Sequence, residues 1–305
     1  MKVRLKNYWQ FTLKPQLAKF KSPFVILFFI ILLAECFSFI YMLYWGLTTS
    51  LKSRNDFGLN LFGPPAKVIF ANFTTSFEKL YVEIQYGAGM RRVMFTELLF
   101  NSLVIAVGWA VISVFSRLAV AYVVCKYPMR FNKVMHFIVV FSIVVPTIGS
   151  LGASLNFLRV MGYYDNLPLL LLGAFQFADS GMLIWYGVWR GIPGEYMEAA
   201  RVDGAGHWRT LLTIMLPMVR VPLMILLVLG FIGYWNAYMI PFTQLPSKPT
   251  LALSLWYFQS SSDNEINSIP MQMAAAMIVS FPCIVLFLIF QRGMVGNLTA
   301  GGLKG

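Results

Sequence analysis

The densest cluster of charge and glycine lies between two strongly apolar stretches, in the segment EYMEAARVDGAGHWRTLLTIMLPMV (Glu195 to Val219). Its first eight residues have the composition of a short helix. We expect this helix to end at Asp203 and Gly204, because glycine adopts the left-handed conformation of a helix end at the least cost. A second helix is predicted from about His207 to Met215. Exposed carboxylate and guanidinium groups on a short helix suit charge-assisted contacts with another protein, so the segment is predicted to be a docking element.

Three ionisable residues lie inside stretches that are otherwise apolar: Glu35, Arg117 and Asp179. If these stretches cross a bilayer, each charge costs a few kcal/mol unless it meets a partner or a wet cavity. Arg117 can pair with Glu35 or with Asp179 and so stabilise the helices. Alternatively, any of the three can contact a hydroxylated solute, and the sequence favours neither the pairing nor the solute contact.

A second set of polar and aromatic residues also interrupts the apolar stretches: Asn156, Gln176, Trp235, Asn236 and Tyr238. Amide groups satisfy sugar hydroxyls and aromatic rings stack on the apolar face of a pyranose, so these residues are candidates for a solute path. The alternative for the aromatic residues is an anchoring role at the membrane surface.

Enzyme chemistry is not predicted. His136 and His207 have no second histidine or carboxylate at catalytic spacing, and Cys36, Cys125 and Cys283 have neither paired spacing nor nearby histidines. We therefore expect no metal site and no disulfide framework. The sequence also contains no Gly-rich loop ending in Gly-Lys-Ser or Gly-Lys-Thr, so we expect this chain to bind no nucleotide or other cofactor itself.

The elements that carry these residues are predicted to be membrane-spanning helices. Hydrophobic residues make up 58% of the 305 positions and charged residues 12%, which is too apolar for a soluble domain of this length. A spanning helix needs about 20 mainly apolar residues. Six stretches meet this requirement, at about 24–47, 98–124, 134–158, 167–189, 221–244 and 270–291. The predicted fold class is an all-α membrane protein with six transmembrane helices.

The basic residues set the predicted orientation. Lysines and arginines are concentrated before the first stretch and after the second, fourth and sixth, which all fall on one side if the helices alternate. By the positive-inside rule that side is the cytoplasm, so both termini are predicted to be cytoplasmic. This distribution also explains the net charge of +12 without nucleic acid as a partner.

The predicted organisation follows from these stretches. Residues 1–23 form a basic cytoplasmic segment, either held at anionic membrane lipid or simply solvated. The first helix at 24–47 and an external loop at 48–97 follow. The core with helices two to six is predicted at 98–292, including the charged loop at 190–220, and a cytoplasmic tail at 293–305 ends the chain.

The charged loop resembles a known signature. Glu198-Ala199-Ala200, three residues, Gly204, nine residues and then Ile214-x-Leu216-Pro217 match the EAA signature of permease subunits in prokaryotic ABC importers. "FNSLVIA" (Phe100 to Ala106), "EAARVDGA", "GYWNAYMIPF" (Gly233 to Phe242) and the tail "GNLTAGGLKG" resemble the carbohydrate, maltose-type branch of that family. The resemblance covers roughly residues 22 to 305.

The resemblance implies a type I ABC importer permease fold in the cytoplasmic membrane of a prokaryote. It further implies a second permease subunit, two cytoplasmic ATP-binding subunits that use ATP and magnesium, and an external solute-binding lipoprotein or periplasmic protein. Coupling to the ATPase is expected at Glu198, Ala199, Ala200, Arg201, Asp203 and Gly204. The tail is expected to reach into the ATPase dimer.

Carbohydrate import, without enzymatic activity in this chain, is therefore the expected function. Two alternatives stay open. One is an ABC permease for an amino acid, a peptide or a metal. The other is a secondary transporter in which Glu35 or Asp179 relays protons.

Overall fold

The computed structural model describes residues 23–127, 129–145 and 149–295, most of them in helices. The basic segment predicted at 1–23, except for Pro23, and the tail residues from 296 lie outside the described residues. The contacts within the chain separate two units. One contains the residues up to Phe73 together with Ser268–Met277, and the other contains Thr74–Asn267 together with the residues from Ile278.

The first unit contains α3 (Pro23–Ser50), α4 (Arg54–Leu59) and the start of α5 (Ala71–Lys79). Apolar side chains of α3 are exposed on all sides along most of its length, which is how a helix presents itself to lipid. The connection after α3 is held by polar contacts. Lys52, which is fully buried, donates to the carbonyl of Asn60 at 2.6 Å, and the amide of Asn72 donates to the carbonyls of Ser50 and Lys52.

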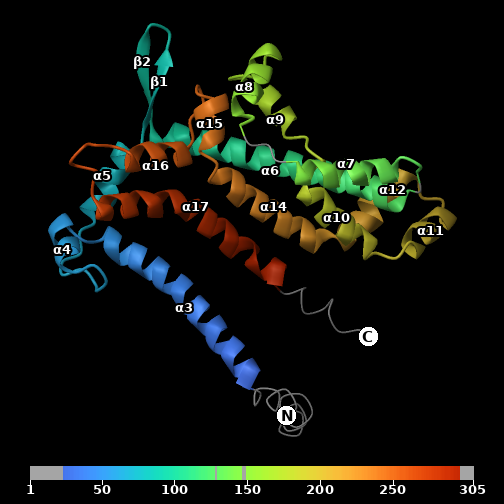
Figure 1. Cartoon of the computed structure of the whole chain (residues 1–305), viewed down its shortest axis with the longest axis horizontal. Coiled ribbons are helices and arrows are strands. Elements are labelled where there is room, and N and C mark those ends of the chain that lie inside the picture. Colours follow the sequence, from blue (N-terminus) through green and yellow to red (C-terminus); the bar gives the residue numbers. More distant parts are fainter. Residues whose placement is uncertain (1–22, 128, 146–148, 296–305) are drawn as a thin grey trace. The chain divides into compact units, whose positions relative to one another are not determined.

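The second unit is built around α6 (Phe95–Lys126). This helix packs against α14 (Arg220–Trp235) and α10 (Ser180–Arg190) along much of its length (Figure 1). Small residues allow the close approach, as is usual between membrane helices. A Cβ atom at Gly108 would lie 2.7 Å from Leu171 on α9 (Leu167–Gly173), and one at Gly230 would touch Ala110.

Three of the six predicted stretches are continuous helices: α3, α6 and α17 (Ile269–Val295). The other three are each divided into two helices, and in two of them a proline, Pro146 or Pro241, indicates a helix end or kink in the sequence. The stretch at 134–158 divides into α7 (Asn132–Val144) and α8 (Leu151–Val160), 167–189 into α9 and α10, and 221–244 into α14 and α15 (Met239–Gln244). Apolar composition does not distinguish a broken helix from a straight one, because the polar groups that stabilise a break come from other elements.

The charged loop forms the two predicted helices. The first, α11 (Glu195–Val202), ends where the sequence predicts, with Gly204 at a φ of +74°. The second comprises α12 (His207–Thr210), a single π turn η2 (Leu211–Met215) and α13 (Leu216–Met218), and a bend of 78° separates it from α14. Pro217 cannot donate a backbone hydrogen bond and crowds the preceding turn, which accounts for the irregular helix there.

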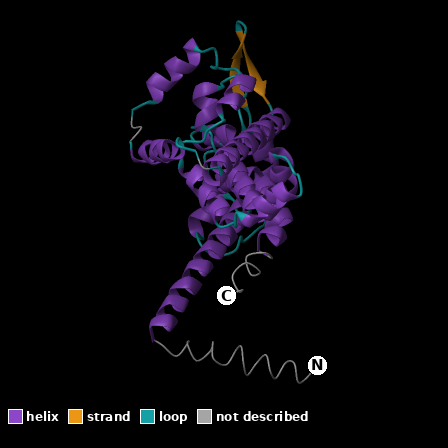
Figure 2. Cartoon of the chain, turned by 90° about the vertical axis from the view of Figure 1, so that its right-hand side faces the viewer, coloured by secondary structure: helices purple, strands orange, loops and turns teal. Residues whose placement is uncertain are grey.

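A β-hairpin departs from the predicted all-α class. Strands β1 (Val82–Tyr86) and β2 (Gly89–Val93) pair antiparallel, with Val82 opposite Val93, and the turn contains Gly87 at a φ of +60°. The hairpin projects away from the helices (Figure 2). Glu83 accepts a hydrogen bond from Arg92 at 2.9 Å, which raises the pKa of Arg92. β1 packs against α16 (Leu251–Gln259).

Candidate functional site

The short helix α11 is closed by hydrogen bonds within its own end. The backbone N–H of Ala205 donates to the carbonyl of Ala200, and that of Gly204 donates to the carbonyl of Arg201. These two bonds with a left-handed residue between them form a Schellman motif, which satisfies carbonyls that the helix end leaves unpaired. The position of Gly204 in this motif is the physical reason for a glycine in the sequence at that point.

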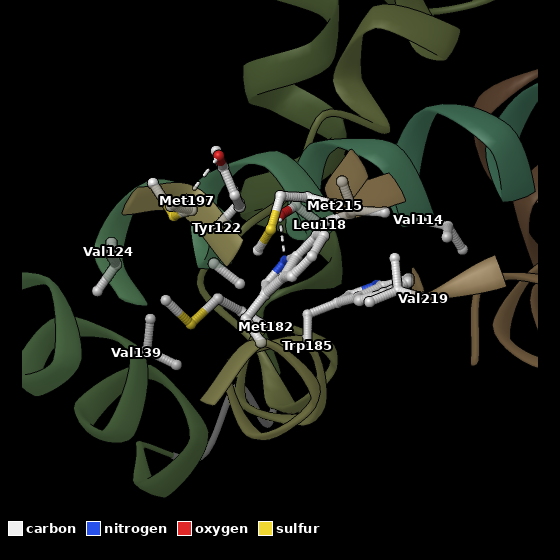
Figure 3. Packing of buried hydrophobic residues seen from close by; sticks show 12 residues of the cluster. Val114, Leu118, Tyr122, Val124, Val139, Met182, Trp185, Met197, Met215 and Val219 are labelled. Atoms are coloured by element: carbon white, nitrogen blue, oxygen red, sulfur yellow. Dashed lines mark hydrogen bonds between the residues drawn. The ribbon is translucent and has the colours of Figure 1, made fainter. Parts of the chain in front are cut away.

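One face of α11 is buried against the end of α6. Met197 is 6% exposed and Ala200 is 2% exposed. The side chains of Met197 and Tyr122 point toward each other, and the Tyr122 hydroxyl lies 4.0 Å from the Met197 sulfur (Figure 3). The ring of Tyr122 in turn packs edge-on against Trp189 of α10, with ring centroids 5.1 Å apart. Movement of α11 is therefore resisted by α6 and α10 together.

Polar contacts hold the segments before and after α11 at the C-terminal end of α6. The Lys126 ammonium donates to the carbonyl of Ile192, just before α11. The Tyr127 hydroxyl hydrogen-bonds Nδ1 of His207 at 2.8 Å, just after it. The sequence showed no catalytic partner for His207, and in the structure its ring holds the start of α12 against Tyr127.

The opposite face of α11 is exposed. Glu195, Glu198, Arg201 and Val202 all lie on it or at its edge. Five of the six residues predicted for coupling are exposed: Glu198, Ala199, Arg201, Asp203 and Gly204. The sixth, Ala200, faces the interior of this chain, so it fixes the helix to its own unit. A partner that docks on α11 would meet a surface with both signs of charge.

The break between α9 and α10 contains a charged pair. Arg117 of α6 and Asp179 form an ion pair at 2.5 Å, with side chains that are 17% and 33% exposed. Asp179 is also the N-cap of α10, where it accepts from the backbone N–H of Met182. Of the two partners that the sequence allowed for Arg117, Asp179 is the one observed, whereas Glu35 lies on the exposed surface of α3 in the other unit.

Side chains from neighbouring helices stabilise the broken backbone. The hydroxyl of Ser116 on α6 donates to the carbonyl of Gln176 at 2.8 Å, and that of Ser142 on α7 donates to the carbonyl of Ala178 at 2.6 Å. Gly181 leaves room for Arg117, because a Cβ atom there would lie 2.7 Å from the arginine side chain. The break is thus a fixed structural feature of the membrane region.

The candidates for a solute path lie in different environments. Asn156 and Gln176 are exposed on α8 and on the connection after α9, and Asn236 is exposed at the end of α14, where its amide donates to the carbonyl of Ile232. Tyr238 stacks on Trp256 with centroids 5.8 Å apart. Trp235 is only 1% exposed, and its indole donates to the carbonyl of Val279. Trp235 therefore has a structural role and no free face for a solute.

Sequence reasoning missed the residues that receive α11. Tyr122, Lys126 and Tyr127 lie at the C-terminal end of α6, about 70 residues before the charged loop in the chain. A Tyr and a Lys at the end of an apolar stretch are also the usual residues at a membrane surface, so their types gave no separate signal.

Comparison with known proteins identifies the family. Residues 118–296, more than half of the chain, match the model of the family described as "Binding-protein-dependent transport system inner membrane component". Two solved structures of a bacterial alginate ABC transporter show the same fold. One has a TM-score of 0.70 at 20% identity and covers 88% of this chain and 95% of that chain. The other, in complex with an alginate pentasaccharide-bound periplasmic protein, has a TM-score of 0.58 at 15% identity with the same coverage.

Characterised relatives extend over most of the chain. The maltodextrin transport system permease protein MdxG of Bacillus subtilis is 30% identical over 67% of this chain and 74% of its own length. The melibiose/raffinose/stachyose import permease protein MelC of the same species is 25% identical over 85% and 89%. The diacetylchitobiose uptake system permease protein NgcG of Streptomyces coelicolor is 23% identical over 85% and 82%.

Proposed function

Because the chain belongs to the family of binding-protein-dependent transport system inner membrane components, we propose that it is a permease subunit of an ABC importer that carries a carbohydrate into the cell. The observation that supports this most strongly is the match to saccharide permeases over most of their length. The chain is a multi-pass protein of the cytoplasmic membrane. Its characterised relatives are transport permeases and not enzymes.

The proposed topology has six crossings with both termini in the cytoplasm. Three crossings are the continuous helices α3, α6 and α17, and the other three pass through the broken pairs α7–α8, α9–α10 and α14–α15. Two groupings in the structure support this. Lys126 and Tyr127, at the end of α6, contact Ile192 before α11 and His207 after it. In this topology the end of α6 and the whole α11 loop are cytoplasmic. The hairpin and α16, both external in it, pack together.

Partners are proposed from family membership and from the composition of the chain. The assembly would contain a second permease subunit, two ATP-binding subunits that hydrolyse ATP with magnesium, and an external solute-binding protein. No sequence motif for nucleotide phosphates occurs in this chain, so the energy must come from a partner.

We assign coupling to the exposed face of α11. An ATPase that moves against Glu198 and Arg201 would push the helix, and the buried contacts of Met197 and Ala200 would carry the movement into α6 and α10. A rigid connection suits this role because packed side chains transmit displacement with little compression. Alternating access would then follow as a rigid-body movement of the two permease subunits.

The proposed solute path runs past the polar interruptions of the helices. Asn156, Gln176, Asn236 and Tyr238 remain candidates for contact with the carbohydrate, and the break that holds Arg117 and Asp179 belongs to the same set of interruptions. Glu35 lies exposed on α3, and a solute contact or proton relay there stays a prediction from the sequence. The contacts of Asp179 favour a structural role over that of a proton relay, because its carboxylate pairs with Arg117 and also caps α10 at the backbone N–H of Met182.

Reconstitution tests the proposal. The chain, its partner permease and the ATPase would be purified together, placed in proteoliposomes with the external binding protein, and supplied with labelled maltopentaose, stachyose, glutamine or a dipeptide. We expect uptake of at least one saccharide that requires ATP and persists with a protonophore. Uptake of glutamine or the dipeptide alone would assign another solute class, and uptake abolished by the protonophore with ATP present would indicate a proton-coupled transporter.

A further inference from the structure

A crevice of about 500 Å³ lies in the second unit beside the hairpin. Three segments that are distant in sequence form it: strand β1, the turn after α8 at Tyr164–Asp165, and the region from α15 to α16. All three are external in the proposed topology. Its volume is within the range of small-molecule sites in proteins.

One wall of the crevice is a fixed group of aromatic rings. Phe242 and Tyr257 line it, and both pack against Trp256, with centroids 5.3 and 5.1 Å from that ring. Tyr238 also stacks on Trp256. Phe242 and Tyr257 are nevertheless 43% and 41% exposed, so each retains a face or edge open to the crevice. A ring held in this way is preorganised to stack on a ligand.

The other walls present hydrogen-bonding groups, mostly acceptors. Glu83, Gln85 and Asp165 line the crevice together with Ser247. Asp165 is held in a left-handed conformation with a φ of +55°. Its backbone N–H donates to the carbonyl of Gln244 at 2.8 Å, and its Oδ1 accepts from the backbone N–H of Ser247 at 3.0 Å. The second carboxylate oxygen has capacity left for a ligand.

We propose that this crevice binds one unit of an uncharged oligosaccharide outside the membrane, by stacking on Tyr257 and hydrogen bonds from sugar hydroxyls to Asp165 and Gln85. This inference deepens the proposed function and rests on it. Hydroxyl groups donate to carboxylates and amides, and the apolar face of a pyranose covers an aromatic ring, so the wall chemistry matches such a ligand on both sides.

Charge decides against an acidic saccharide. Two carboxylates, Glu83 and Asp165, line the crevice. Arg92 forms an ion pair with Glu83, and Arg159 lies over the ring of the lining residue Tyr164, but among the described residues Asp165 forms no ion pair. The carboxylate of a uronate in the crevice would be repelled by the Asp165 carboxylate, because both groups are negatively charged. Maltopentaose and stachyose should therefore bind here, and an alginate pentasaccharide should not.

The test measures binding to the purified permease complex in nanodiscs without the external binding protein. Maltopentaose, stachyose and an arabinotriose serve as uncharged probes, and saturation-transfer NMR and equilibrium dialysis serve as readouts. We expect binding of at least one probe, weakened about tenfold by Tyr257→Ala, as for loss of one favourable contact. Tyr257→Phe keeps the ring and should stay within about threefold of wild type, which shows that the site is still folded.

Tyr86→Ala is the matched control. Tyr86 belongs to the same hairpin as the crevice wall and is 70% exposed, but it does not line the crevice, so its loss should leave binding unchanged. The proposal is overturned if no uncharged probe binds, if Tyr86→Ala and Tyr257→Ala weaken binding equally, or if the alginate pentasaccharide binds as well as the uncharged probes.

A protein-docking role gives a different result. If the crevice accepts a loop of the external binding protein, Tyr257→Ala will weaken the affinity of that protein for the complex and leave saccharide binding unchanged, which also overturns the proposal. Failure of the proposed function is distinguishable, because it appears as an absence of ATP-driven saccharide uptake and does not depend on direct binding to the complex.

Discussion

Helix α11 and the crevice, which lie on opposite sides of the membrane in the proposed topology, both depend on one residue at positive φ, but they use it differently. Gly204 closes α11 through hydrogen bonds that reach back no more than five residues. Asp165 joins the turn after α8 to residues 244–247, about 80 positions away in the chain. The first arrangement is local and the second is tertiary.

This difference explains what can be recognised in the sequence. A motif that is closed by its own neighbours must keep its residue types at fixed spacing, and the α11 loop therefore carries a signature of contiguous residues. A site assembled from three separate segments has no such spacing. Its aromatic and carboxylate residues look like ordinary loop residues until the fold brings them together.

Gly204→Val should reduce transport more than any other single substitution in α11 or the crevice. A β-branched residue in the left-handed region costs about 1–3 kcal/mol, so α11 should lose its closing motif. Because a Cβ atom at Gly204 has open space, the effect comes from backbone conformation alone. We expect at least a tenfold loss of uptake in proteoliposomes while the protein still inserts.

Gly206→Val is the control for that change, since Gly206 has a φ of −70° and also has open space around it. Its uptake should stay close to wild type. Equal loss in both variants, or normal uptake by Gly204→Val, would remove the backbone argument for α11.

Met197→Ala should come next, because it tests whether α11 is connected to α6 by packing. Truncating a buried Met costs about 2–5 kcal/mol, and here it removes the contact with Tyr122. We expect a lower melting temperature and ATP hydrolysis that is no longer matched by uptake. Tyr196→Ala is the neighbouring control, as Tyr196 is 48% exposed. A Met197→Ala complex with unchanged coupling would show that the packing does not transmit force.

Asp165→Ala tests the tertiary closure of the crevice. The change places an alanine in the left-handed region, which costs about 1–2 kcal/mol of stability. It also removes the hydrogen bond from the backbone N–H of Ser247, which contributes about 1 kcal/mol. Saccharide uptake should fall several-fold. Asp165→Asn should retain most activity, because Asn tolerates this conformation and keeps the acceptor. If the two variants behave alike at wild-type level, the turn does not shape the crevice.

Glu198→Lys should have the smallest effect. An exposed charge at the rim of an interface contributes about 0.2–1 kcal/mol, so reversal should weaken ATPase association a few-fold without unfolding α11. The effect should diminish at high salt, because screening weakens contacts between exposed charges. Glu83 is a half-exposed carboxylate on the hairpin, which is external in the proposed topology, so Glu83→Lys should leave ATPase association unchanged. The measurement is co-purification of the ATPase at two salt concentrations.

The sequence predicted the parts of this protein that depend on composition and near neighbours. Apolar composition predicted a helical membrane protein, and Gly204 marked the end of α11 where the structure has it. The orientation inferred from the basic residues stays a prediction. Pro146 and Pro241 indicated helix ends or kinks in two of the divided stretches, but the sequence did not predict the break at Ala174–Asp179 or the hairpin. Broken helices keep the same apolar composition, and the hydroxyls of Ser116 and Ser142 that compensate for one break belong to other helices.

By itself, then, the sequence determined that the chain is a helical membrane protein with a short charged helix closed at Gly204, because these features depend on local energy terms. Only the tertiary structure decided that Arg117 pairs with Asp179, that Trp235 is buried against Val279, and that Ala200 faces inward. Side chains of one type have several possible partners in a chain of this length. The packing of helices selects one of them, because a buried charge or donor must be satisfied at the place where the backbone puts it.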